Sequence, residues 1–120
     1  MDKINLNEKA DEIAEKMVSV IDAPKDQYKE LARVFALALL QAAEGKGKSR
    51  HADDVTPFQD QLVMKIQELC GEGFASGQVF KKTVEGTKLV KEGRKETGLT
   101  DILGMLNYGA ALYIRLNEKY

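Results

Sequence analysis

Apolar residues recur every three or four positions along most of this chain, and almost no stretch alternates apolar with polar residues. The first spacing matches the 3.6-residue period of an α-helix, whereas half-buried strands need the alternation. The sequence therefore predicts an all-α fold. A length of 120 residues fits a single domain over residues 1–120, built as a bundle of about five helices.

Proline and glycine residues divide this pattern. Pro24 favours a restart after the first helix, and Gly71 and Gly93 are typical of helix ends. Thr56 and Pro57 predict an N-cap followed by a first helical turn. The predicted helices span residues 5–21, 24–43, 58–70, 76–92 and 99–118, and residues 44–57 form one long basic loop.

The large apolar residues predict which helix faces point inward, and Cys70 is expected to be a small core residue. Small residues such as Gly104 and Gly109 in the last helix predict a close approach by another helix. The inward positions expected in the last three helices are Phe58, Leu62, Ile66 and Leu69, then Val79, Phe80, Thr83, Val84, Thr87 and Val90, and finally Leu99, Ile102, Leu103, Leu106, Ala110, Tyr113 and Ile114.

The second and fifth predicted helices carry more apolar surface than one side of a small bundle needs. In the helix over 24–43, apolar residues cover almost the whole circumference. Large exposed apolar patches are uncommon on soluble monomers, so we expect a homo-oligomer that pairs these faces. The alternative is a compact monomer in which both helices are central.

Charge and cysteine content exclude several classes of protein. A formal net charge of -1, from 18 Lys+Arg against 19 Asp+Glu, excludes a polyanion binder that works by global charge, and we expect no nucleic-acid partner. One cysteine excludes an internal disulfide framework. The uncharged run Val34–Ala43 is far shorter than the roughly 20 residues that span a bilayer, and the start of the chain does not resemble a signal peptide. We expect a cytoplasmic protein without membrane contact.

The basic loop is the predicted site for a small anionic ligand, because its glycines let backbone amides turn toward an anion beside several cations. Residues 42–49 satisfy a relaxed P-loop pattern, but a helix precedes them and no strand does, so a true P-loop is not expected. The alternative is a solvated connector. The loop residues predicted to bind the ligand are Lys46, Lys48, Ser49, Arg50 and His51.

Further residues are expected to complete this site. Gln78, Lys81 and Lys82 share the polar side of the helix over 76–92, where amide and ammonium groups would support phosphates. Phe58 or Tyr108 would face a nucleobase. The alternative is an ordinary solvated surface. This interpretation needs no catalytic residue and no cofactor.

Carboxylates in the first two helices suggest an alternative site, because helical nucleotide hydrolases bind magnesium through such side chains. Their positions on the helix place them opposite the apolar stripe, so a charged outer face is the other interpretation. The carboxylates concerned are Asp11, Glu12, Glu15, Asp26 and Glu30.

Two segments carry a family resemblance: Leu99 to Leu112, which contains Asp101 and then Asn107-Tyr108, and Asp60 to Ile66, which opens with Asp-Gln. They are similar to small all-α proteins, often from phages, that are related to MazG-like nucleotide pyrophosphohydrolases. The resemblance implies a nucleotide-binding helical oligomer in which the metal carboxylates are largely missing, since Gly104 stands where an aspartate is expected.

The sequence therefore predicts a non-enzymatic helical oligomer that binds or sequesters a small anionic ligand. We expect this ligand to be a nucleotide, with phage counter-defence as a role. One alternative is a magnesium-dependent MazG-like nucleoside triphosphate pyrophosphohydrolase. Another is a protein-protein adaptor or inhibitor that works through its helix faces.

Overall fold

The computed structural model describes residues 3–45 and 55–120. These ranges hold five α-helices and one short 3₁₀ helix, with no strand among them, which confirms the predicted all-α fold. The elements are α1 (Lys3–Ser19), α2 (Lys25–Glu44), η1 (Phe58–Asp60), α4 (Leu62–Cys70), α5 (Gly73–Lys91) and α6 (Lys95–Lys119).

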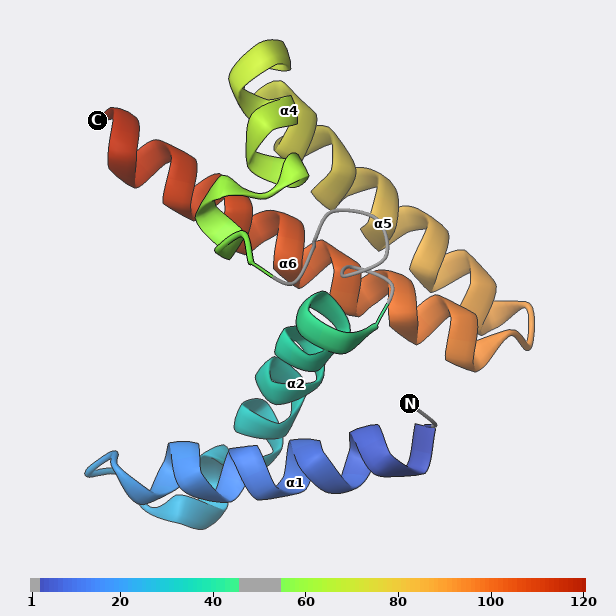
Figure 1. The fold of residues 1–120 in the computed structure, drawn as a ribbon. Coiled ribbons are helices and arrows are strands. Elements are labelled where there is room, and N and C mark those ends of the chain that lie inside the picture. Colours follow the sequence, from blue (N-terminus) through green and yellow to red (C-terminus); the bar gives the residue numbers. More distant parts are fainter. Residues whose placement is uncertain (1–2, 46–54) are drawn as a thin grey trace.

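The long helices form two hairpins that meet at one crossing (Figure 1). α1 packs along α2, and α5 packs along α6. The C-terminal part of α2 crosses the middle of α6, and α4 contacts both α5 and α6. Because the hairpins touch at this crossing rather than along their lengths, much of α2 lies outside a common bundle.

The predicted helix boundaries differ most from the structure in the third and fifth predicted helices. The helix expected over 58–70 is divided, because Gln61 is extended (φ -73°, ψ 170°) between η1 and α4. The side-chain amide of Gln61 donates a hydrogen bond to the Thr56 carbonyl at 3.0 Å, so Gln61 rather than Thr56 precedes the α-helix. α6 begins at Lys95 instead of residue 99, since Gly98 is helical and buried.

Small residues form most of the core. Within the described part of the chain, the largest fully buried side chains are Gln67 and Val18. α1 meets α2 largely through buried alanines, among them Ala14 and Ala36. A third cluster, formed by Val63, Met64 and Ala111, joins α4 to α6. Helices that meet through such small side chains come close together and leave larger apolar side chains outside.

Several predicted inner faces are consequently wrong. In α5, Phe80 and Val84 are 73% and 53% exposed, whereas Ala75 and Gly86 are buried. In α4, Leu62 and Leu69 are exposed while Val63, Met64 and Gln67 are buried. In α6, Leu99 and Tyr113 are exposed. The expected core residue Cys70 is exposed as well.

Candidate interaction surface

One face of α2 carries four large apolar side chains that the chain leaves about half exposed. Tyr28, Leu31, Phe35 and Leu39 have exposed fractions of 42%, 53%, 48% and 57%. Their spacing of three or four residues places them in one row along the helix. We call these four residues the α2 row. An apolar row of this length is typical of a surface that contacts another polypeptide.

The other faces of α2 are already used inside the chain. Ala32 and Ala36 are buried against α1. Ala38 is buried, and the side-chain amide of Asn107 in α6 donates a hydrogen bond to its carbonyl at 2.9 Å. The α2 row therefore lies between the contact with α1 and the contact with α6.

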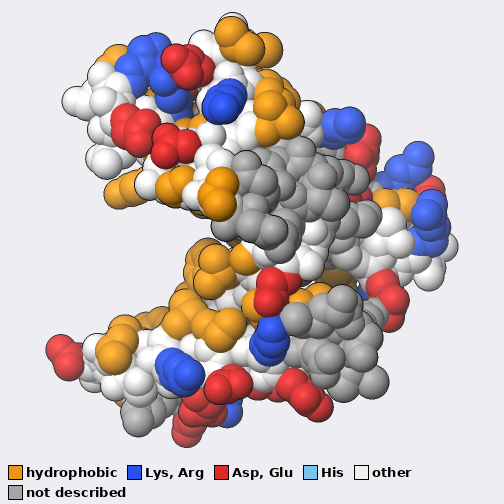
Figure 2. Space-filling view, viewed as in Figure 1, with side chains coloured by type: hydrophobic (Ala, Val, Ile, Leu, Met, Phe, Trp, Pro, Cys, Tyr) orange, Lys and Arg blue, Asp and Glu red, His pale blue; other side chains and the backbone are white. Residues whose placement is uncertain are grey.

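The molecular surface is hollowed between the α1–α2 hairpin and the part that contains α4 and the end of α6 (Figure 2). Hydrophobic side chains gather on the side of the α1–α2 hairpin that faces this hollow, and others lie on the opposite wall. Near the end of α1, Met17, Val20 and Ile21 add further exposed apolar surface. The hollow thus exposes apolar surface that a compact monomer would bury.

The total surface of the chain is large for its mass. The accessible area is 7954 Å², whereas a folded monomer of 13.3 kDa is expected to expose about 6,400 Å². The radius of gyration is 15.1 Å, against about 13.6 Å for a compact domain of this length. Within the described residues, two hairpins that meet at a crossing bury less surface than a compact bundle would.

Polar contacts fix that crossing. The side-chain amide of Gln41 donates a hydrogen bond to the Thr100 carbonyl at 3.2 Å, in addition to the bond from Asn107. Asp101, the residue that follows Thr100 in α6, pairs with Lys82 of α5 at 3.4 Å, and each side chain is only 15% exposed. Lys82, predicted to bind a ligand, is therefore already engaged within the chain.

The predicted anionic-ligand site lies only partly in the described residues. Its basic segment, Lys46, Lys48, Ser49, Arg50 and His51, is outside them. On α5, Lys81 is exposed and Gln78 is half-buried. The structure thus presents Lys81 on the surface, whereas Lys82 belongs to the α5–α6 contact.

The two predicted base-stacking residues are packed in the core. Phe58 and Tyr108 are partly buried and contact the cluster of Val63, Met64 and Ala111. The Tyr108 ring also meets the Phe74 ring edge-on, with centroids 5.9 Å apart. Phe58 and Tyr108 are therefore packed against the same cluster, and their contact with a nucleobase stays a prediction.

The last turn of α2 nevertheless lies near Lys82 of α5. A Cβ built on Gly104 would be 3.7 Å from both the Gln41 side-chain nitrogen and the Lys82 side chain. The Gly45 amide donates to the Gln41 carbonyl at 3.1 Å and so closes the last turn of α2. The side chains of Gln41, in the last turn of α2, and of Lys82 therefore both lie near Gly104 of α6.

The carboxylates of the alternative magnesium site do not converge. Asp11 accepts a hydrogen bond from Arg33 at 2.9 Å. Glu15 pairs with Lys29, and the hydrogen bond between these two side chains raises the pKa of Lys29. Over residues 3–45 and 55–120, no three His, Cys, Asp or Glu side chains are grouped to hold a metal ion. The remaining three predicted ligands, Glu12, Asp26 and Glu30, are exposed.

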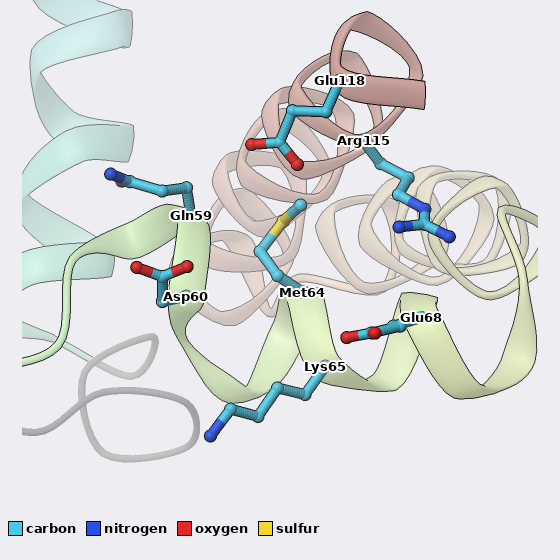
Figure 3. A pocket seen from close by; sticks show the side chains of 7 residues that line it. All are labelled: Gln59, Asp60, Met64, Lys65, Glu68, Arg115 and Glu118. Carbon is cyan, nitrogen blue, oxygen red and sulfur yellow. The ribbon is translucent and has the colours of Figure 1, made fainter. Parts of the chain in front are cut away.

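An open cavity of about 310 Å³ lies beside η1, α4 and the end of α6 (Figure 3). Met64 lies at its centre, the carboxylates of Glu68 and Glu118 turn toward it, and Lys65 points away. The described residues that line it are Gln59, Asp60, Met64, Lys65, Glu68, Arg115 and Glu118. The three carboxylates and two cations among these residues do not favour an anionic ligand, and the described residues of the predicted ligand site, Phe58, Gln78, Lys81, Lys82 and Tyr108, are not among them.

Ion pairs hold the start of α5 to the end of α6. Glu72 accepts a hydrogen bond from Lys119 at 3.0 Å and lies 3.9 Å from the Nε of Arg115. A backbone hydrogen bond and the bond from Lys119 lower the pKa of the Glu72 carboxyl, and the bond to Glu72 raises the pKa of Lys119. The C-terminal turn of α6 is therefore fixed by charge.

Comparisons with protein-family models, with curated proteins and with solved structures give no match. Among the described residues, no helix combines the length and the apolar character needed to cross a lipid bilayer. The site must therefore be interpreted from its own geometry, in which the α2 row places four half-exposed apolar side chains on one helix.

Proposed function

We propose that this chain is a binding protein that works as an assembly of its own copies, and that the α2 row is the assembly surface. The observation that carries the proposal is the half-exposure of four large apolar side chains in one row. Removing the exposed half of such a side chain from water contributes about 1 kcal/mol. Association through this row would therefore bury apolar surface that stays exposed to water in the single chain.

Sedimentation velocity over a range of micromolar concentrations tests this proposal. We expect the wild-type mass to be a multiple of 13.3 kDa. Phe35→Ser should weaken association, because Phe35 is 48% exposed in the single chain and would be buried in the assembly. Lost burial of about 1.5 kcal/mol in each of two copies corresponds to an affinity about 100-fold lower.

The matched control removes an exposed apolar side chain elsewhere. Leu69 of α4 is 87% exposed and lies outside the α2 row, so Leu69→Ser should leave the mass unchanged. Circular dichroism checks that both variants keep their helices. A wild-type chain that remains a monomer throughout, or dissociation caused by Leu69→Ser alone, would contradict the proposal.

A second candidate function is capture of a small anionic ligand, such as a nucleotide, by the assembled protein. It is supported by the side chains of Gln41 in the last turn of α2 and of Lys82 in α5, which both lie near Gly104, and by the exposure of Lys81. Calorimetry with nucleoside mono-, di- and triphosphates and cyclic dinucleotides tests it. Lys81→Ala should reduce the heat of binding, and Lys88→Ala, at an exposed lysine farther along α5, should not. No heat from any of these nucleotides would contradict this function.

Two other functions follow from the sequence. Magnesium-dependent hydrolysis of nucleoside triphosphates is supported by the MazG-like resemblance, whereas the separate ion pairs of Asp11 and Glu15 give it no geometric support. Release of pyrophosphate from a triphosphate with magnesium is its test. An adaptor or inhibitor would use the same exposed apolar face as the assembly, and a monomeric chain that retains this face would favour it.

A further inference from the structure

We propose that the outer face of α5 binds an amphipathic helix of a partner protein, and that carboxylates on the flank of that helix pair with Lys81 and Lys88 of this chain. α5 packs along α6, and α6 lies between α5 and the α1–α2 hairpin (Figure 1). The outer face of α5 is therefore separate from the α2 row, and its occupant does not depend on the proposed self-association.

The outer face of α5 carries a row of residues with the spacing of a coiled-coil seam. These residues are separated alternately by four and three positions, and the mean of 3.5 is the repeat that keeps one side of a helix turned toward a second helix. We call this row the α5 seam. Its six residues are Gly73, Gly77, Phe80, Val84, Thr87 and Lys91, and all of them are exposed.

Two large apolar side chains occupy the middle of the α5 seam. Phe80 and Val84 have exposed fractions of 73% and 53%, and they lie one turn apart on the same side of the helix. Gly86, which is buried and contacts Gly98, marks the opposite side as the one packed against α6. A narrow apolar strip on a helix that is already packed behind is typical of a contact with one further helix.

The charges beside the α5 seam define the partner. Lys81 and Lys88 each follow a seam residue and lie on one flank, where the charges that select a partner helix stand in coiled coils. Both side chains are exposed, and within the described part of the chain Lys81 forms no ion pair and Lys88 lies 4.0 Å from Glu92. The other flank carries the hydroxyls of Ser76 and Thr83. A helix with carboxylates opposite the lysines is therefore complementary, whereas one with lysines there would be repelled.

A glycine in the α5 seam leaves room for a close approach. A Cβ built on Gly77 would meet nothing within 4 Å, whereas one built on Gly86 would be 2.8 Å from the Gly98 carbonyl oxygen. Packing among the described residues thus explains glycine at position 86 but not at position 77, although glycine inside a helix is less stable than alanine. Gly77 instead lets the backbone of a partner helix come close.

A polypeptide helix fits this surface better than a lipid bilayer or a nucleic acid. Helices that lie in a membrane surface bury a broad apolar face, whereas Phe80 and Val84 are the only large apolar side chains of the α5 seam. Nucleic-acid surfaces carry clustered cations, but Glu85 and Glu92 stand close to the lysines of α5. The short apolar strip with one cationic flank therefore favours an acidic amphipathic helix.

Two synthetic helical peptides of about 21 residues, or three heptads, provide the probe. Both carry leucine at their seam positions; one has glutamate at every flank position and the other has lysine. Fluorescence anisotropy should show that the glutamate peptide binds at least about tenfold more tightly, and added salt should narrow this preference. Equal affinities of the two peptides, or no binding of the glutamate peptide, would overturn the proposal.

A matched pair of substitutions locates the binding surface. Phe80→Ser should weaken binding of the glutamate peptide by about tenfold or more, because the largely exposed ring would be buried in the complex. Phe35→Ser, the same substitution in the α2 row, should leave this affinity unchanged even where it abolishes self-association. Binding that Phe35→Ser removes and Phe80→Ser preserves would place the peptide on α2 and overturn the proposal, whatever the oligomeric state of the wild type.

Charge reversal tests the role of the flank. Lys81→Glu with Lys88→Glu should invert the preference, so that the lysine peptide binds more tightly than the glutamate peptide. Lys16→Glu with Lys65→Glu, at two exposed lysines on other helices, should keep the original preference. Circular dichroism checks that all variants keep their helices. A preference that is unchanged in the α5 double variant would show that Lys81 and Lys88 do not select the partner.

Two further measurements distinguish other occupants. Co-sedimentation with vesicles of phosphatidylserine and phosphatidylcholine that Phe80→Ser abolishes, in the absence of peptide binding, would assign the outer face of α5 to a membrane and overturn the proposal. A wild-type oligomer that Phe80→Ser dissociates to 13.3 kDa would assign this face to a second copy instead. We expect neither effect of Phe80→Ser.

Discussion

Gly86 of α5 and Gly98 of α6 lie in direct backbone contact. A Cβ built on Gly98 would be 2.6 Å from the Gly86 carbonyl oxygen, and one built on Gly86 would be 2.8 Å from the Gly98 carbonyl oxygen. Cβ atoms do not approach backbone atoms this closely, so both positions require glycine. This contact sets the distance between α5 and α6 and therefore decides which side chains fit between them.

Gly98→Ala should destabilise the protein by at least about 1 kcal/mol, because overpacking against backbone outweighs the higher helix propensity of alanine. Gly109→Ala is the matched control in the same helix, since a Cβ there would meet nothing within 4 Å. It should stabilise by about 0.5–1 kcal/mol. Urea unfolding followed by circular dichroism measures both, and equal effects of the two substitutions would contradict the role of the glycine pair.

The same contact explains which parts of the fold the sequence could not predict. Helical period and the stops at Gly71 and Gly93 are local signals, and both glycines do have positive φ at helix ends. Contact through Gly86 joins two helices, and no local pattern encodes it. The inner face of α5 contains Ala75, Lys82 and Gly86, so apolar spacing alone selected a neighbouring face instead.

The exposed apolar face of α2 could also be predicted only in part from the sequence. Apolar residues nearly all round α2 indicated a surplus for one chain, but not which of them remain exposed. That outcome depends on where α2 crosses α6, and Gln41 and Asn107 fix this crossing through long-range hydrogen bonds. The contact between the Tyr108 and Phe74 rings also joins distant parts of the chain, so the sequence alone did not indicate it.

Gln67 should be replaceable by methionine at little or no cost. It is completely buried, its side-chain nitrogen donates to the Ala111 carbonyl at 3.1 Å, and its side-chain oxygen is buried without a hydrogen-bond partner. Gln67→Met removes that oxygen and keeps the volume, so the free energy of unfolding should stay within about 1 kcal/mol or rise. Gln67→Ala leaves a cavity and should cost about 2 kcal/mol or more. Urea unfolding distinguishes them, and equal losses would contradict the argument.

Lys82→Met should cost about 2 kcal/mol of stability. Lys82 and Asp101 form an ion pair in which both side chains are 15% exposed, and removing one partner leaves the other charge poorly solvated. Lys81→Met, at the exposed neighbouring lysine, should change stability by less than about 0.5 kcal/mol. Thermal unfolding of the two variants provides the comparison. If Lys82→Met were as stable as the wild type, the ion pair would not fix α5 to α6.

Acid should loosen the C-terminal turn of α6 through Glu72. Its carboxyl pKa is lowered in the folded protein by a backbone hydrogen bond and by the bond from Lys119. A lowered pKa means that this contribution is fully present above the ordinary glutamate range and is lost as the pH falls through that range toward the folded-state value. Because these groups are partly exposed to solvent, added salt should reduce the effect.

Amide hydrogen exchange of residues 116–120, followed by NMR as the pH is lowered, measures this loosening. In the wild type, protection of these amides should fall as Glu72 is protonated, after correction for the intrinsic pH dependence of exchange. In Glu72→Gln, protection should be lower at neutral pH and should show no such step, since the glutamine does not titrate. Glu92→Gln is the control, because Glu92 lies 4.0 Å from Lys88 at the other end of α5. A step that persists in Glu72→Gln would assign the acid sensitivity to another carboxyl.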